Sequence, residues 1–332
     1  MPPRMTQSLI KGFNAVANHA YLIIFPLLLD LFIWFGPVMT GTHSLSTFMK
    51  LFEQGMQEQL QQPEVIAQFK SIQPALNELI GSFNLFGFLN TMPIGIPSLM
   101  AFQNVTETPL GLVQKLSTTS IAKEFAIFLL IIVAGSILGA IFISEIGRIC
   151  NLDKTKQTFS IKNLLMNSLW LVLLNFAIWG LIVLVLFPSM TIVVLLTMIN
   201  ATIGNIANFV VLLLLFWMII PLLFTPHAVV IQQTNPLKAM LSSIRLIRFY
   251  LPGTGFFVLF SLLLYQGLNQ FLWLQPVLTS YMLLGGIFGH AFISTGLLAS
   301  SFFYYQDGLT WMNHNLKMIA QQTNQPDRPF QA

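Results

Sequence analysis

Charge and cysteine are what this sequence has least of. Lys, Arg, Asp and Glu make up 8% of the 332 residues, whereas a soluble domain carries about 25%. So little charge excludes an ordinary water-exposed surface for a chain that is 55% hydrophobic. The single cysteine, Cys150, excludes an internal disulfide and a cysteine-based metal cluster.

Motifs that carry catalysis or nucleotide binding are also missing from the sequence. It contains no Walker loop, no G-x-S-x-G nucleophile turn, no G-x-G-x-x-G fingerprint and no H-E-x-x-H zinc motif. Basic residues do not gather with aromatic residues in the manner of a nucleic-acid surface. We therefore expect no enzymatic activity, no cofactor, no metal ion and no nucleic-acid partner.

Long apolar runs are what the sequence has in abundance. A helix of about 20 apolar residues crosses the ~30 Å hydrocarbon core of a bilayer. We predict an all-α, polytopic transmembrane helix bundle that forms a single membrane domain over 1–332. Its six spans lie near 20–39, 124–146, 164–187, 203–225, 254–274 and 280–304.

The apolar stretch from Thr191 to Phe224 is too long for one crossing. We interpret 190–201 as an interfacial or re-entrant segment that precedes the fourth span. The alternative is a separate span there, which would reverse the orientation of everything downstream.

The distribution of Lys and Arg decides between these counts, because cytoplasmic loops collect basic residues. Six spans with the N-terminus inside place most of the 15 Lys and Arg residues on inner segments. Seven spans would place Lys238, Arg245 and Arg248 outside. We predict a multi-pass protein of a prokaryotic cell membrane, with both termini in the cytoplasm.

Three inner segments of similar character lead into spans, at 8–14, 160–167 and 236–243. The last of them follows Asn235 and Pro236, a cap and a first-turn proline that predict a helix start. Glycine pairs four residues apart, Gly135 with Gly139 and Gly285 with Gly289, allow close helix packing in lipid. These features indicate three pseudo-repeated helical hairpins, although basic loops and glycines also occur in polytopic proteins without repeats.

The segment 239–248, with sequence AMLSSIRLIR, is followed by a span, and the last span ends in FFYYQD at 302–307. Both resemble parts of the membrane-anchoring domain of bacterial glycerophosphoryl diester phosphodiesterases and related six-helix membrane domains of unknown function. That family continues with Arg after the Asp, whereas Gly308 and Leu309 follow here. The resemblance covers 150–332 and implies a six-helix membrane fold. We carry over no phosphodiesterase activity.

The longest segment between spans, 40–123, is predicted to be an extracytoplasmic helical cap. Apolar residues recur at helical spacing over 45–60, 65–72 and 76–83, and the apolar run 85–97 is too broken to span. The cap is either structural or a docking surface for a lipid or protein partner.

Polar residues inside the predicted spans form the candidate site. An Asp at the centre of a span costs roughly 2.5–3.5 kcal/mol on insertion scales, and Asp30 lies there. We expect an intramembrane polar pocket built from Asp30, Asn175, Asn208, Gln266, Asn269 and His290. The alternative is that these side chains only form hydrogen bonds between helices.

At the inner surface, the expected ligands are lipid headgroups, which Lys162, Lys238, Arg245 and Arg248 can reach. Glu145 and Arg148 have the spacing of an ion pair on one helix. We predict a non-enzymatic membrane subunit, assembly factor or anchor that meets lipids and meets proteins through the cap 40–123 or the inner helix 236–250. The alternative is a small carrier or lipid-handling protein that uses the polar pocket.

Overall fold

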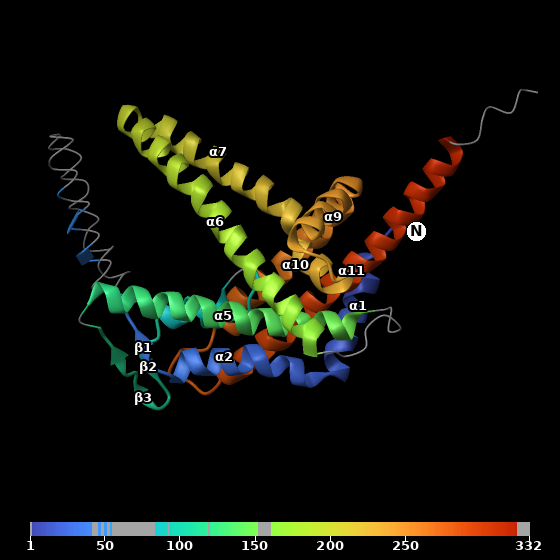
Figure 1. Cartoon of the computed structure of the whole chain (residues 1–332). Coiled ribbons are helices and arrows are strands. Elements are labelled where there is room, and N and C mark those ends of the chain that lie inside the picture. Colours follow the sequence, from blue (N-terminus) through green and yellow to red (C-terminus); the bar gives the residue numbers. More distant parts are fainter. Residues whose placement is uncertain are drawn as a thin grey trace, which may run out of the picture. The chain divides into compact units, whose positions relative to one another are not determined.

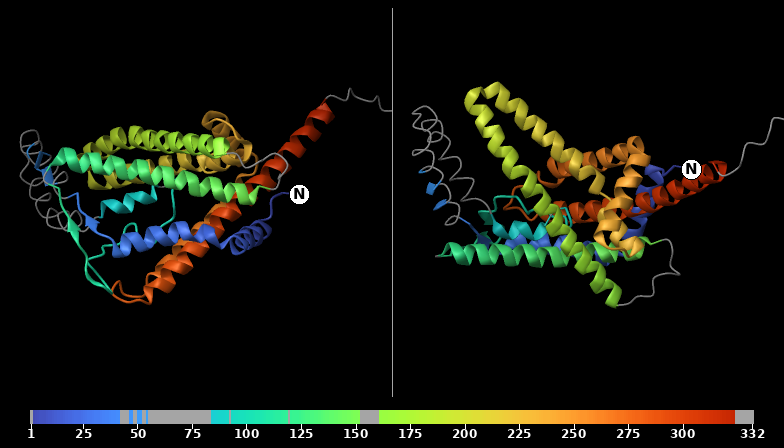
Figure 2. Two further views of the ribbon diagram at one scale, coloured as in Figure 1. Left: turned by 60° about the horizontal axis from the view of Figure 1, so that its bottom comes forward. Right: turned by 45° about the horizontal axis from the view of Figure 1, so that its top comes forward.

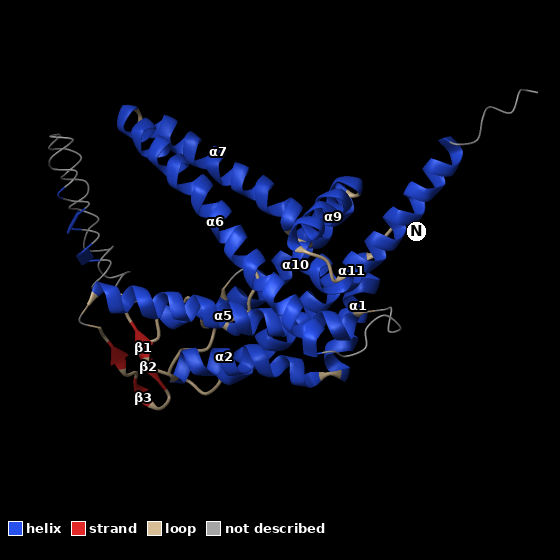
Figure 3. Ribbon diagram, viewed as in Figure 1, coloured by secondary structure: helices blue, strands red, loops and turns tan. Residues whose placement is uncertain are grey.

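The structure is a computed structural model that describes residues 2–41, 46–47, 50–51, 54, 84–91, 93–118, 120–151 and 161–323 (Figure 1). Helices make up most of the described chain, and the strands are very short (Figure 3). The predicted all-α helical bundle is therefore confirmed. The predicted cap helices at 45–60, 65–72 and 76–83 lie almost entirely outside the described residues.

The helices are those of an integral membrane protein. Five are long and apolar enough to cross a membrane: Ile121–Cys150, Lys162–Ile199, Ala201–Gln232, Leu251–Trp273 and Leu283–Gln321. The bent pair Met5–Asn18 and Ala20–Phe35 makes a sixth if it counts as one span. Each of the six predicted spans overlaps one of these helices.

The chain divides into two compact units. Unit 1 consists of Met1–Ala20, Ile143–Leu264 and Gly296–Ala332, and unit 2 consists of Tyr21–Phe142 and Tyr265–Thr295.

Unit 2 is built around α2 (Ile24–Phe35) and the first two thirds of α5 (Ile121–Cys150). A 3-10 helix, η2 (Leu85–Asn90), lies before α5 in the chain, and η1 (Ala20–Ile23) leads into α2. The π-helical turn η4 (Asn269–Trp273) and the start of α11 (Leu283–Thr323) complete the unit. Strand β1 (Val38–Met39) pairs in parallel with β4 (Lys115–Leu116), and β2 (Glu107–Thr108) pairs antiparallel with β3 (Gly111–Leu112).

The glycine pair of α5 packs against a loop rather than against another helix. A Cβ atom added at Gly139 would lie 2.5 Å from the Cα atom of Gly95, and one at Gly135 would lie 2.5 Å from the carbonyl oxygen of Leu89. Small residues thus allow close approach, as predicted, but the partners are the 3-10 helix η2, through Leu89, and the loop that follows it, through Gly95. Ile94 and Met100 of this loop are completely buried.

Unit 1 contains a long helical hairpin. Helices α6 (Ile161–Ile199) and α7 (Ala201–Ile219) pack against each other beside the turn that joins them and diverge away from it (Figure 1, Figure 2). Asn200 joins them and caps α7, because its side-chain oxygen accepts hydrogen bonds from the amides of Thr202 and Ile203. The segment 190–201 was predicted to be separate from the third span, but its residues up to Ile199 belong to α6, which continues through Pro188.

The remainder of unit 1 packs around aromatic side chains. It contains α1 (Met5–Asn18), η3 (Ile220–Leu222), α8 (Thr225–Gln232), α9 (Pro236–Phe249), most of α10 (Leu251–Leu268) and the larger part of α11. The rings of Phe257 and Tyr304 stack with centroids 4.3 Å apart. The predicted helix start at Asn235 and Pro236 is confirmed, since the Asn235 side chain accepts the amide of Lys238.

Two predicted boundaries differ from the structure. Helix α11 runs without a break to Thr323, well past residue 304, where the last span was predicted to end. The first predicted span is represented in unit 2 by α2, which ends at Phe35. Gly36 then adopts extended backbone.

Candidate functional site

Asp30 is the buried carboxylate of α2 and binds a loop in unit 2. Its Oδ1 atom accepts a hydrogen bond from the Ser98 hydroxyl at 2.5 Å and one from the backbone amide of Met100 at 3.0 Å. The Asp30 side chain is completely shielded from solvent. Because hydrogen bonds to a carboxylate are stronger than neutral ones, Asp30 provides a firm attachment for residues 98–100.

His290 of α11 faces the other oxygen of the same carboxylate. The distance between His290 Nδ1 and Asp30 Oδ2 is 3.9 Å, too long for a hydrogen bond but short enough for an ion pair. Within the described part of the chain, Asp30 Oδ2 and both ring nitrogens of His290 have no hydrogen-bond partner. Oδ1 of Asp30 is thus hydrogen bonded, whereas Oδ2 faces the imidazole and has no hydrogen-bond partner among the described residues.

Residues from the η4 region complete the surroundings of His290. The ring of Tyr265 meets the imidazole edge-on, with centroids 5.4 Å apart, and the Tyr265 side chain hydrogen bonds with Asn269. One turn after Asp30, the Trp34 indole donates to the carbonyl of Leu278 at 2.9 Å. One face of α2 therefore binds two non-helical segments, 98–100 and the one that contains Leu278.

The structure brings together part of the predicted polar pocket. Asp30 and His290 lie face to face, and Asn269 joins them through Tyr265. Gln266 is exposed. Asn175, which is buried on α6, and Asn208, which is half-buried on α7, belong to unit 1.

Sequence reasoning missed Ser98, the Met100 amide and Tyr265. Ser98 and Met100 lie in a segment that reads as an outer loop, and no periodicity indicates that it packs on α2. Tyr265 carried a weak signal, since it directly precedes Gln266 in an apolar run.

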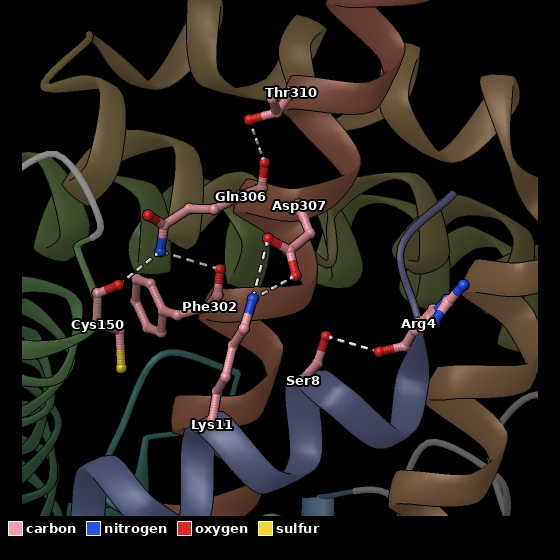
Figure 4. A network of polar contacts seen from close by, with 8 residues as sticks. All are labelled: Arg4, Ser8, Lys11, Cys150, Phe302, Gln306, Asp307 and Thr310. Atoms are coloured by element: carbon pink, nitrogen blue, oxygen red, sulfur yellow. Dashed lines mark hydrogen bonds and ion pairs between the residues drawn. The ribbon is translucent and has the colours of Figure 1, made fainter. Parts of the chain in front are cut away.

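A second polar network lies in unit 1, where α1 meets α11 (Figure 4). The Lys11 ammonium forms an ion pair with Asp307 at 3.0 Å, and both side chains are partly exposed. The neighbouring Gln306 donates from its amide to the carbonyls of Cys150, at 2.9 Å, and Phe302, at 3.3 Å. Lys11 thus supplies a positive charge beside Asp307.

The polar face of α9 carries the predicted headgroup ligands. Lys238, Arg245 and Arg248 are exposed, and so are Leu237 and Leu241 between them. The opposite face of α9 is buried through Ala239, Ser243, Leu246 and Ile247. Lys162, at the start of α6, is exposed as well.

Ion pairing at the end of α5 follows the prediction, since Arg148 and Glu145 approach to 2.7 Å. Among the described residues, no three His, Cys, Asp or Glu side chains gather as a metal site would require.

Comparison of the chain with protein-family models, curated proteins and solved structures gives no match. The resemblance to the membrane-anchoring domain of the phosphodiesterases therefore stays a prediction.

Proposed function

We propose that this chain is a non-enzymatic membrane subunit that acts through its surfaces, with the tip of the α6–α7 hairpin as the part that meets another protein. The observation that carries the proposal is the length of α6 in a hairpin that the rest of the chain leaves largely uncovered. Only 6% of the most apolar stretch of Lys162–Ile199 and 17% of that of Ala201–Gln232 are buried within the chain, close to the 11% of Leu251–Trp273 and far below the 61% of Leu283–Gln321.

Helix α6 is longer than one crossing of a bilayer requires. Without its polar first turns, about 30 residues remain, or about 45 Å at 1.5 Å per residue. A bilayer core of about 30 Å accommodates only about 32 Å of a helix tilted by a typical 20°. The end of the hairpin near Ile199 therefore extends past the hydrocarbon that would otherwise cover it.

The tip of the hairpin combines exposed apolar side chains with side-chain amides. Ile199 is 75% exposed and Phe209 is 67% exposed. Asn205 is exposed between them, and Asn208 is half-buried. Lipid chains cannot satisfy amides and water does not favour large apolar side chains, whereas a protein interface accepts both.

The basic face of α9 complements this role. Lys238, Arg245 and Arg248 can bind anionic headgroups at the cytoplasmic surface while Leu237 and Leu241 enter the interface. With α9 inside, the start of α6 is inside too, and the hairpin tip lies on the outer side. We place the protein in a prokaryotic cell membrane with both termini in the cytoplasm.

Photo-crosslinking in intact membranes tests the proposal. A photoreactive side chain at Ile199 or Phe209 should crosslink to one defined protein species. The same probe at Leu263 of α10, which is 63% exposed, should reach lipid alone. A crosslink to a second copy of the chain would identify self-association as the role of the tip. Lipid adducts alone from both tip positions would contradict the proposal.

The alternative function, a small carrier or lipid-handling protein, has one specific observation in its favour. Asp30 and His290 face each other inside unit 2, as a proton-coupled site requires. Both side chains are nevertheless 0% exposed. This closed packing favours a protein that acts through its surfaces.

A further inference from the structure

Asp30 and His290 face each other with atoms that lack hydrogen-bond partners among the described residues, and this limits how many protons the pair can hold. Oδ2 of Asp30 and Nδ1 of His290 lie 3.9 Å apart, and no third group of the described chain hydrogen bonds to either. Each side chain is buried deeply enough that an uncompensated charge on it would be costly.

Counting protons identifies the state that this packing allows. With no proton, the anionic Asp30 faces a neutral imidazole and has donors on Oδ1 only. With two protons, the cationic His290 faces a neutral carboxyl group. With one proton, the pair is either an ion pair or two neutral groups, and its net charge is zero.

We propose that Asp30 and His290 hold one proton between them, and that this proton keeps residues 98–100 bound to α2. The mechanical link is direct, because the carboxylate that shares the proton also accepts the Ser98 hydroxyl and the Met100 amide. Loss of the proton leaves a buried anion, and hydration of that anion requires the segment 98–100 to move away.

The groups around the pair do not supply a competing charge. Tyr265 from α10 is the titratable side chain that faces His290, and tyrosine keeps its proton up to about pH 10. The other charged residues among the described part of unit 2 lie on other segments: Lys50, Glu107, Lys115 and Lys123 are exposed, and Glu124 is at the buried start of α5.

The pH dependence follows from comparing the bound segment with the opened one. In the opened state, hydrated Asp and His titrate near their ordinary pKa values of about 3.9 and 6.5. Between these values both states hold one proton, so opening does not depend on pH. Above about pH 6.5 only the bound state keeps its proton, and each further pH unit weakens it about tenfold.

Hydrogen exchange of the Met100 amide in nanodiscs measures this equilibrium. After correction for the intrinsic exchange rate, protection should be constant from about pH 5 to 6.5 and fall about tenfold per unit above it. Protection falls as pH rises because the bound segment holds one proton more than the opened segment above about pH 6.5.

The variant Asp30→Asn should reverse this profile. Its amide oxygen can still accept from Ser98 and Met100, but the bound state then holds a neutral His290 and no proton. Protection should be constant above about pH 6.5 and fall about tenfold per unit below it, because opening now takes up a proton. The double variant Asp30→Asn/His290→Gln should show no dependence over this range.

His227→Gln is the matched control, since His227 is a buried histidine of unit 1 that pairs with Ser301 rather than with an acid. It should keep the wild-type profile. A constant wild-type protection from pH 5 to 9 would overturn the proposal without any variant. A fall above pH 6.5 that persists in Asp30→Asn would overturn it as well.

Discussion

At the scale of single residues, buried polar side chains satisfy the backbone where helices are interrupted. Asp30 accepts the Met100 amide of a loop. Ser243 accepts the Phe224 amide and donates to the Pro221 carbonyl at the junction of η3 and α8. Buried non-helical backbone is stable only when protein groups satisfy its hydrogen bonds. These side chains are therefore structural requirements of the interruptions they bind.

Packing of the loop at Gly95 against α5 requires a glycine at position 139. We expect Gly139→Ala to destabilise the protein by about 1–3 kcal/mol, because the new methyl group would meet the backbone of Gly95 and Ile94. Thermal unfolding in detergent measures the change.

The matched control is Gly285→Ala, since a Cβ atom at Gly285 meets nothing within 4 Å. It should leave the unfolding temperature unchanged or raise it slightly, as alanine favours a helix over glycine. Equal effects of the two substitutions would mean that the loop does not pack on α5 as described.

At the scale of elements, α9 separates its two faces by chemistry. Small and aliphatic residues, among them Ala239 and Leu246, are buried, and the three basic residues are exposed. A helix with this division lies in the plane of a membrane interface, and its position depends on the charge of the lipid.

Neutralisation of the basic face should release anionic lipid. Each cation near an anionic surface contributes about 1 kcal/mol, so Lys238→Gln/Arg245→Gln/Arg248→Gln should weaken binding of phosphatidylglycerol by about a hundredfold. Native mass spectrometry in detergent compares this lipid with phosphatidylcholine. Lys115→Gln, an exposed lysine of unit 2, is the control and should change nothing. If the triple variant retained as much phosphatidylglycerol as the wild type, α9 would be excluded as the lipid site.

At the scale of the whole molecule, the sequence predicted the fold class and the six apolar segments, since hydropathy alone determines which segments enter lipid. It could not predict that α6 continues past Pro188, because exposed asparagines near the tip read as an interruption. It placed Asp30 with His290 from their depth in the spans. The contact of Ser98 with Asp30 is a tertiary contact, 68 residues apart, for which local pattern gives no signal.

The orientation of the chain in the membrane is a property of the whole molecule and can be tested by labelling. Because Cys150 is the only cysteine and is buried, introduced cysteines report on topology in the wild-type background. With a membrane-impermeant maleimide on intact cells, Leu112→Cys should react, and Lys317→Cys should react only after permeabilisation. Leu112 is 86% exposed and Lys317 is exposed too, so access differs only by side. The reverse pattern would invert the proposed topology.

The attachment of 98–100 to α2 also constrains the order in which the protein is assembled. Synthesis proceeds from α2 to α11, so Asp30 meets the insertion machinery before Ser98 is made and long before His290 exists. Until both partners are made, the newly synthesised α2 carries a carboxyl group that costs roughly 2.5–3.5 kcal/mol to insert and that no later segment yet binds.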